Sequence, residues 1–168
     1  VVPRSGVGPQ LIYVVGGDDE GGEAISSVEL YDPQATSWTQ RAGMTVARAA
    51  HDCIALEGKL YAVGGWGDDD EDLDTAEVYD PQTDGWQPLA KMSTARSELG
   101  LAAVGGKMYA IGGYLGVGEA LESVEAYDPQ LGAWAVVASM SAGRCDFALV
   151  VLDGKIYAMG GYHRGLLD

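Results

Sequence analysis

The sequence is short of positive charge and has no long apolar run. Ten lysines and arginines stand against 25 aspartates and glutamates, which gives a net charge of -15 at pH 7. A chain this negative is repelled by phosphate groups, so nucleic acid and anionic membranes are excluded as main partners and a basic partner is favoured. Because no apolar run approaches the roughly 20 residues that a membrane-spanning helix needs, we expect no membrane partner.

Cysteine and histidine are scarce and irregularly placed. Cys53 and Cys145 fall at different positions of a repeat that runs through the chain, and so do the only histidines, His51 and His163. We therefore expect free thiols in a reducing compartment, which predicts a cytoplasmic protein. The sequence contains neither Gly-x-Ser-x-Gly nor His-Glu-x-x-His, and its glycine pairs lack the spacing of a phosphate-binding loop. It thus predicts no catalytic residues, no metal and no cofactor.

What the sequence does have is a repeat with a period of 48 residues, marked by a pair of glycines. The pairs are Gly16-Gly17, Gly64-Gly65, Gly112-Gly113 and Gly160-Gly161. A tyrosine before each pair, a Tyr-Asp-Pro-Gln segment, a tryptophan, a methionine and an arginine recur in the same phase. The repeated arginines are Arg48, Arg96 and Arg144. A strand-rich unit of about 40 to 50 residues at a fixed period is typical of a propeller blade.

Each unit predicts antiparallel strands joined by turns, with no helix. A short apolar run such as Leu60–Val63 ends at the glycine pair and is typical of a central strand covered on both faces. It is entered through a tight turn, Glu57-Gly58-Lys59, so the run before that turn should pair with it as an inner strand. An alternating strand then ends at Asp-Pro, and a last strand begins at the tryptophan. These strands make one four-stranded blade.

The chain holds about three and a half such units, at approximately residues 1–46, 47–94, 95–142 and an incomplete 143–168. Propellers typically carry about 4 to 8 blades, so the predicted fold is all-β, a propeller fragment. Arg4 precedes Gly16 by 12 residues where later units use 16, which predicts that the first blade lacks its inner strand. Exposed blade edges are expected to drive self-association of this fragment.

The glycine pair, the tyrosine and tryptophan at fixed distances and the Met-x(3)-Arg ending together resemble Kelch repeats over essentially the whole chain. The endings Met92–Arg96 and Met140–Arg144, with Tyr-Asp-Pro, look most like the Kelch-like adaptors. In those proteins BTB and BACK domains, which are not in this chain, recruit a cullin ubiquitin ligase while the propeller holds the substrate. The resemblance implies a Kelch β-propeller fragment that binds proteins as the substrate-recognition part of such an adaptor.

The resemblance also implies where a partner binds. Residues just after each glycine pair and each repeated arginine stand at strand ends on one mouth of the ring, and they differ between units. In Kelch-like adaptors this mouth binds substrates. The implied site is Trp66, Tyr114, Tyr162 and Arg164 after the glycines, with His51, Glu98, Asp146 and Phe147 after the arginines.

An acidic run of Asp68, Asp69, Asp70, Glu71 and Asp72 lies beside this mouth, in a connection whose sequence varies between units. Its alternate aspartates superficially resemble a calcium loop, but the glycine at the sixth position and the distal glutamate of an EF-hand are missing. A solvated acidic loop that attracts a basic partner is the favoured interpretation, and calcium binding is the less favoured one.

Residues that recur in every unit are interpreted as scaffold. The tryptophans and tyrosines should pack between blades, where they bury large apolar areas. The repeated arginines should bind carbonyl groups or the in-phase glutamates, because an unpaired buried charge is costly. Those glutamates are Glu29, Glu77 and Glu125.

An enzyme is the alternative to a protein-binding module, since Kelch rings also occur in galactose oxidase and in sialic-acid-modifying proteins. An oxidase would need tyrosine and histidine copper ligands that converge on the axis, and two histidines at unrelated positions do not supply a convincing set. The sequence therefore favours a non-enzymatic domain that binds a protein or peptide, basic in character, over a carbohydrate-active or oxidase enzyme.

Overall fold

The computed structural model describes residues 10–116, 118 and 120–163. In these residues all regular structure is β-strand, apart from a 3-10 turn at Asp68–Asp70, and no helix is long and apolar enough to cross a membrane. The strands are β1 (Ile12–Val15), β2 (Val28–Asp32), β3 (Ser37–Arg41), β4 (Asp52–Leu56), β5 (Lys59–Val63), β6 (Ala76–Asp80), β7 (Gly85–Pro88), β8 (Gly100–Val104), β9 (Lys107–Ile111), β10 (Val124–Asp128), β11 (Ala133–Val137), β12 (Ala148–Leu152) and β13 (Lys155–Met159). The predicted all-β fold is confirmed.

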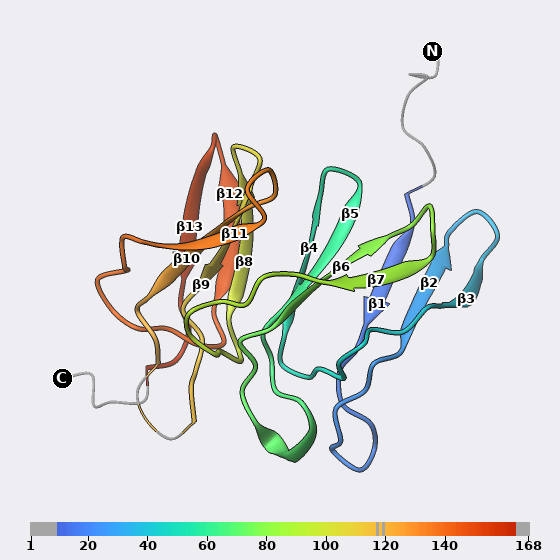
Figure 1. Ribbon diagram of the computed structural model, residues 1–168, viewed down its shortest axis with the longest axis horizontal. Helices are drawn as coiled ribbons and strands as arrows, with labels where there is room; N and C mark the ends of the chain where they lie inside the picture. Colours follow the sequence, from blue (N-terminus) through green and yellow to red (C-terminus); the bar gives the residue numbers. More distant parts are fainter. Residues whose placement is uncertain (1–9, 117, 119, 164–168) are drawn as a thin grey trace.

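The strands form successive antiparallel sheets that stand beside one another (Figure 1). Blade 1 is β1-β2-β3, blade 2 is β4-β5-β6-β7, blade 3 is β8-β9-β10-β11 and blade 4 is the pair β12-β13. In the described residues, which begin at residue 10, blade 1 has three strands; the segment in which the sequence predicts no inner strand lies largely outside them. The inner strands β4, β8 and β12 lie next to one another, so they line the inner side of the array.

Local turn chemistry explains why each inner strand folds back on its neighbour. Leu56 pairs with Lys59, which leaves Glu57 and Gly58 as a two-residue loop with φ values of 51° and 78°. Positive φ at both positions defines a type I′ turn, whose twist matches that of the flanking strands. The loops at residues 105–106 and 153–154 repeat this conformation. The tight hairpins predicted from the glycines are therefore present.

A second turn ends each third strand at the Asp-Pro sequence. In blade 2 the backbone N–H of Gln82 donates a hydrogen bond of 2.9 Å to Asp80 Oδ1. The other carboxylate oxygen of Asp80 lies 3.3 Å from Lys59 Nζ, on the neighbouring strand. The aspartate thus closes its own turn and pairs with the lysine that begins the preceding strand.

Apolar side chains pack between neighbouring blades. Tyr61 and Val63 of β5 join Leu101 of β8 and Met108 of β9 in one buried cluster. Trp86 of β7 is 9% exposed, and its indole N–H donates to the carbonyl of Ala42, in the segment after blade 1, at 2.9 Å. The packing role predicted for this tryptophan is confirmed.

The end blades are more exposed than the sequence predicts. The apolar run at Leu11–Val15 predicts a strand covered on both faces, yet Ile12 and Val14 of β1 are exposed. Trp38, which was expected to pack between blades, is 53% exposed. Both differences have one cause: among the described residues, no inner strand flanks β1 and no blade precedes blade 1.

Candidate partner-binding site

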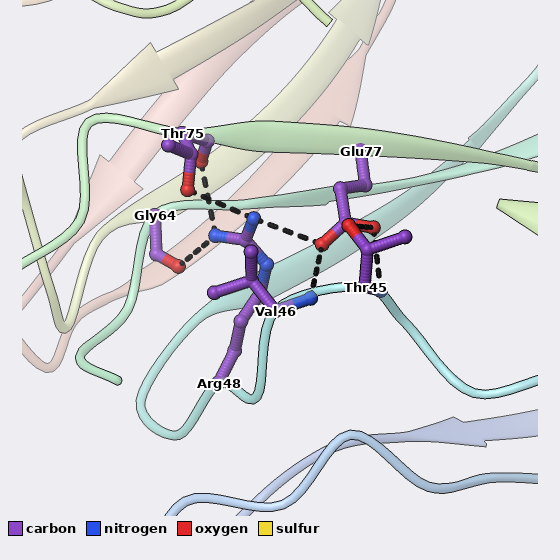
Figure 2. A network of polar contacts seen from close by, with 6 residues as sticks. All are labelled: Thr45, Val46, Arg48, Gly64, Thr75 and Glu77. Atoms are coloured by element: carbon purple, nitrogen blue, oxygen red, sulfur yellow. Dashed lines mark hydrogen bonds and ion pairs between the residues drawn. The ribbon is translucent and has the colours of Figure 1, made fainter. Parts of the chain in front are cut away.

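The mouth of the array rests on a buried arginine in each complete blade. Figure 2 shows the guanidinium of Arg48 joining the end of β5 to the start of β6. Nη1 donates to the carbonyls of Gly64 at 2.9 Å and Thr75 at 3.0 Å, and Nη2 donates to Thr75 Oγ1 at 2.9 Å. Nη2 also lies 3.2 Å from Glu77 Oε1, and neither side chain is more than 2% exposed. The guanidinium is therefore paired, as a buried charge requires.

The carboxylate of Glu77 carries this link to the preceding blade. Its Oε2 accepts hydrogen bonds from the backbone N–H of Thr45 at 2.8 Å and the hydroxyl of Thr45 at 2.6 Å (Figure 2). Its Oε1 accepts a bond of 3.0 Å from the backbone N–H of Val46. One glutamate thus holds the segment between blades 1 and 2 against β6.

Blade 3 repeats the arrangement and blade 4 repeats part of it. Arg96 donates to the carbonyls of Gly112 and Ser123 and to Ser123 Oγ, and its Nη2 lies 3.0 Å from Glu125 Oε1. Arg144 donates to the carbonyl of Gly160 at 2.7 Å. The scaffold role predicted for the arginines is confirmed, with Glu77 and Glu125 as the acidic partners.

Three residues with left-handed backbones connect successive blades at the mouth. Ala50, Glu98 and Asp146 each follow a repeated arginine by two residues and have φ values of 47°, 51° and 50°. The N–H of Glu98 donates to the carbonyl of Ala50 at 2.8 Å, and that of Asp146 donates to the carbonyl of Glu98 at 3.3 Å. Positive φ is strained for these residue types, and the inter-blade hydrogen bonds hold it. Glu98 and Asp146 consequently occupy matching places on adjacent blades.

The aromatic residues after the glycine pairs are bridged to the residues after the arginines. Trp66 pairs with Ala49, Tyr114 with Ser97, and Tyr162 with Cys145, each as an isolated antiparallel bridge. Both backbone hydrogen bonds of the Tyr114 bridge are formed, at 2.7 and 3.0 Å. The two groups of residues that the sequence assigned to one mouth therefore lie side by side in each of these blades.

The first cavity at the mouth has a volume of about 380 Å³ and lies against the inner ends of blades 2, 3 and 4. It is lined by Ala50, His51, Asp52, Glu98, Leu99, Asp146 and Phe147. Four of the predicted site residues, those named after the arginines, thus line a single cavity.

Burial sets the charge states in this first cavity. Desolvation lowers the pKa of His51 to about 4, and the Arg48 charge adds to that effect, while backbone hydrogen bonds to Val15 and Arg48 oppose it. His51 is therefore neutral at pH 7. Desolvation raises the pKa of Asp52, although the N–H of Leu101 donates to its Oδ2 at 2.7 Å and favours the carboxylate.

The second cavity has a volume of about 240 Å³ and lies between blades 2 and 3. It is lined by Trp66, Asp70, Asp72, Ser97, Glu98, Tyr114 and Gly116. Glu98 lines both cavities, which makes them neighbours on one surface. Among the described residues, neither cavity is lined by a lysine or an arginine. The surface is therefore acidic with aromatic walls.

The acidic run forms a short 3-10 turn at Asp68–Asp70, at the lower edge of Figure 1. Asp68, Asp70 and Glu71 are exposed, as a solvated acidic loop would be. Asp72 differs: it is half-buried, and its Oδ2 accepts a hydrogen bond of 2.6 Å from the N–H of Gly116 in blade 3. This part of the loop therefore contacts the neighbouring blade.

The remaining predicted residues lie elsewhere. Tyr162 is 58% exposed and lines a separate cavity of about 180 Å³, which it shares with Arg144 and His163. Arg164 lies outside the described residues. Sequence reasoning missed five lining residues of the two cavities, which are Ala50, Asp52, Ser97, Leu99 and Gly116. Each lies close after a repeated arginine or a glycine pair, so taking the whole segment rather than single residues would have found them.

The comparisons with known proteins decide the family. The model of the KLHDC2/KLHL20/DRC7 Kelch-repeats domain matches residues 5–165 of the chain. The chain belongs to the Kelch-repeat family. Its Kelch domain is of a kind that generally binds proteins.

Among solved structures, the structure of YjhT superposes on this Kelch domain with a TM-score of 0.79 at 18% sequence identity. The alignment covers 92% of this chain and 57% of that chain, so this chain spans a little over half the length of YjhT. No curated protein matches the chain by sequence. The likeness to YjhT is one of fold.

Proposed function

We propose that this Kelch domain binds a basic segment of a partner protein at the mouth, without catalysing a reaction. The observation that carries the proposal is the lining of the two cavities that share Glu98, in which the described residues offer carboxylates and aromatic rings but no lysine or arginine. Carboxylates steer a cationic partner toward the surface, and aromatic side chains such as Tyr114 supply the apolar contact that slows its release.

A finer role is proposed on the resemblance to Kelch-like adaptors. The domain would be the substrate-recognition part of a cullin-RING ubiquitin ligase in the cytoplasm, and its bound partner would be the substrate. The family match and the Met-Ser-x-x-Arg endings support this role. A partner held at the mouth should then accumulate in cells when cullin activation is blocked. An unchanged level would remove the adaptor role and leave protein binding intact.

Selection of peptides from a random display library against the chain tests the binding function. The selected peptides should be rich in lysine and arginine and should carry an aromatic or aliphatic residue. Neutralising the exposed carboxylates of Asp68 and Glu71 should mainly slow association, because these charges lie outside the cavities and act at a distance. Tyr114→Ala should mainly speed dissociation.

The matched control is Glu57→Gln, which removes a carboxylate from the hairpin turn at the opposite end of blade 2. This substitution should leave both rates unchanged. If the selected peptides bind the mouth variants as tightly as the parent chain, this mouth is not the binding surface.

A further inference from the structure

Ser97 brings an unused hydroxyl into the second cavity. The residue is 3% exposed and lines that cavity. Its backbone N–H and carbonyl are both paired with Tyr114, and in the described residues its hydroxyl makes no hydrogen bond. Its Oγ is not among the buried side-chain atoms that lack a partner, so the hydroxyl opens into the cavity, where it can accept or donate a hydrogen bond. The matching residues in the neighbouring units are Ala49 and Cys145, so the scaffold does not require a hydroxyl here.

The charges around Ser97 restrict what could bind to this hydroxyl. Asp70, Asp72 and Glu98 line the same cavity, and no lysine or arginine of the described residues does. Of these three, only Asp72 has a carboxylate oxygen bonded within the described residues, where its Oδ2 accepts the N–H of Gly116 at 2.6 Å. An anion would be repelled by these groups, whereas a cation would meet several free acceptors.

The shape of the cavity is also selective. Its volume of about 240 Å³ has room for one long side chain, and the rings of Trp66 and Tyr114 contribute to its walls. A planar guanidinium stacks on aromatic rings and directs five N–H donors in a fixed fork, whereas an ammonium has three donors and no plane. The two carboxylates of Asp70 and Glu98 and the hydroxyl of Ser97 together offer five acceptor oxygens, which exceeds the three donors of an ammonium and equals the five of a guanidinium.

We propose that the second cavity is a subsite for a single arginine side chain of the partner. The guanidinium lies against Trp66 and Tyr114, donates to Glu98 and Asp70, and donates to the Ser97 hydroxyl. This inference rests on the proposed function and deepens it, because it names the side chain that the acidic mouth selects.

The test uses three blocked tripeptides of the form acetyl-Gly-X-Gly-amide, in which X is arginine, lysine or citrulline. Citrulline keeps the shape of arginine and removes its charge. Two-dimensional NMR of the labelled chain follows the Trp66 indole N–H and the backbone amides of Ser97 and Gly116. The arginine peptide should shift these signals saturably. The lysine peptide should bind about fivefold more weakly, and citrulline should produce no shift, since charge-assisted hydrogen bonds are the stronger ones.

Variants of the lining locate the effect. Glu98→Gln should weaken the arginine peptide about fivefold to tenfold, because a charged acceptor is replaced by a neutral one. Ser97→Ala should weaken it about threefold while leaving the unfolding temperature unchanged, since alanine already occupies this position in the unit of Ala49. The control is Glu71→Gln, which removes an equal charge from the same loop outside the cavity and should change affinity by less than about twofold.

Three results would overturn the assignment. Equal shifts with citrulline would show that charge does not matter, and equal or tighter binding of the lysine peptide would remove the guanidinium preference. If Glu71→Gln and Glu98→Gln weakened the affinity for the arginine peptide equally, the peptide would be held by general attraction to the acidic loop and not by the cavity. These results are separable from failure of the proposed function: library peptides that bind the mouth without any need for arginine would refute the subsite alone.

Discussion

Arg96 Nη2 lies 3.0 Å from Glu125 Oε1, and the exposed fractions of the two side chains are 0% and 1%. The same glutamate accepts the backbone N–H groups of Ser93 and Thr94 at 2.7 and 3.2 Å. These two residues belong to the segment that enters blade 3 from blade 2. The ion pair thus fixes both the inside of a blade and its connection to the previous one, directly beneath the mouth.

Removing one member of this pair should strongly destabilise the domain. Glu125→Gln leaves Arg96 buried without its counter-charge, which typically costs about 3 to 5 kcal/mol. The control is Asp74→Asn, since Asp74 pairs with Lys91 at 2.9 Å where the side chains are 37% and 66% exposed. That change should cost at most about 1 kcal/mol. Urea unfolding measures both, and equal losses would contradict the scaffold role of the buried pair.

The tryptophans of blades 1 and 2 should contribute unequally although they occupy the same place in the repeat. Trp86→Ala removes a side chain that is 9% exposed, and truncating a buried tryptophan typically costs about 3 to 5 kcal/mol. Trp38 is 53% exposed, and its ring lies against that of Tyr31 at a centroid distance of 5.0 Å. Trp38→Ala should therefore cost about 1 kcal/mol or less. Thermal unfolding that ranked the two variants in reverse would contradict the packing described above.

His51 should make the domain sensitive to acid. Its pKa is lowered to about 4 in the folded chain from an ordinary value of 6.5, so the unfolded chain takes up a proton first. The stabilisation is complete above pH 6.5 and is lost as the pH falls toward 4. The loss attributable to this group is about 3 kcal/mol. It is measured as the difference in pH dependence between the parent chain and His51→Gln, and identical pH profiles for the two would be evidence against a buried neutral histidine.

Much of the fold could be predicted because its signals are local. Glu57-Gly58 and the Asp-Pro sequences set the ends of strands through their own backbone and side-chain chemistry, and the period placed every strand. Exposure could not be predicted in this way. Ile12 and Trp38 carry the same pattern as their buried counterparts, and only the neighbouring blade makes the difference.

The candidate site could likewise be predicted only in part. The repeat placed His51 and Glu98 on one mouth, since both follow a repeated arginine. The repeat does not decide which glutamate pairs with which arginine, because the glutamates and the arginines all recur with the same period. Ser97 directly follows Arg96, so the repeat could have placed it at the mouth, but its bridge to Tyr114 is a contact between segments that no local pattern reveals.

The exposed ends of the array should make the chain associate with itself. A groove of about 300 Å³ between β1 and blade 2 is lined by apolar residues that include Ile12 and Ile54, and Val150 to Leu152 are exposed on β12. Burial of this apolar surface favours association. Light scattering should show a mass that rises with concentration, and Ile12→Lys should reduce that rise. Leu131→Lys, at a 78% exposed turn residue, is the control. A monomer at every concentration would exclude this behaviour.

The central claim is that the acidic and aromatic mouth is the surface that holds a protein partner. Mapping the amide shifts of the chain on titration with a library-selected peptide tests it most directly. We predict that the shifts concentrate at residues 49–52, 66–72, 97–99, 114–116 and 145–147, which come from different blades and meet at this mouth. Shifts confined to the hairpin turns at residues 57–58 and 105–106, or to the outer strands β3, β7 and β11, would contradict the account.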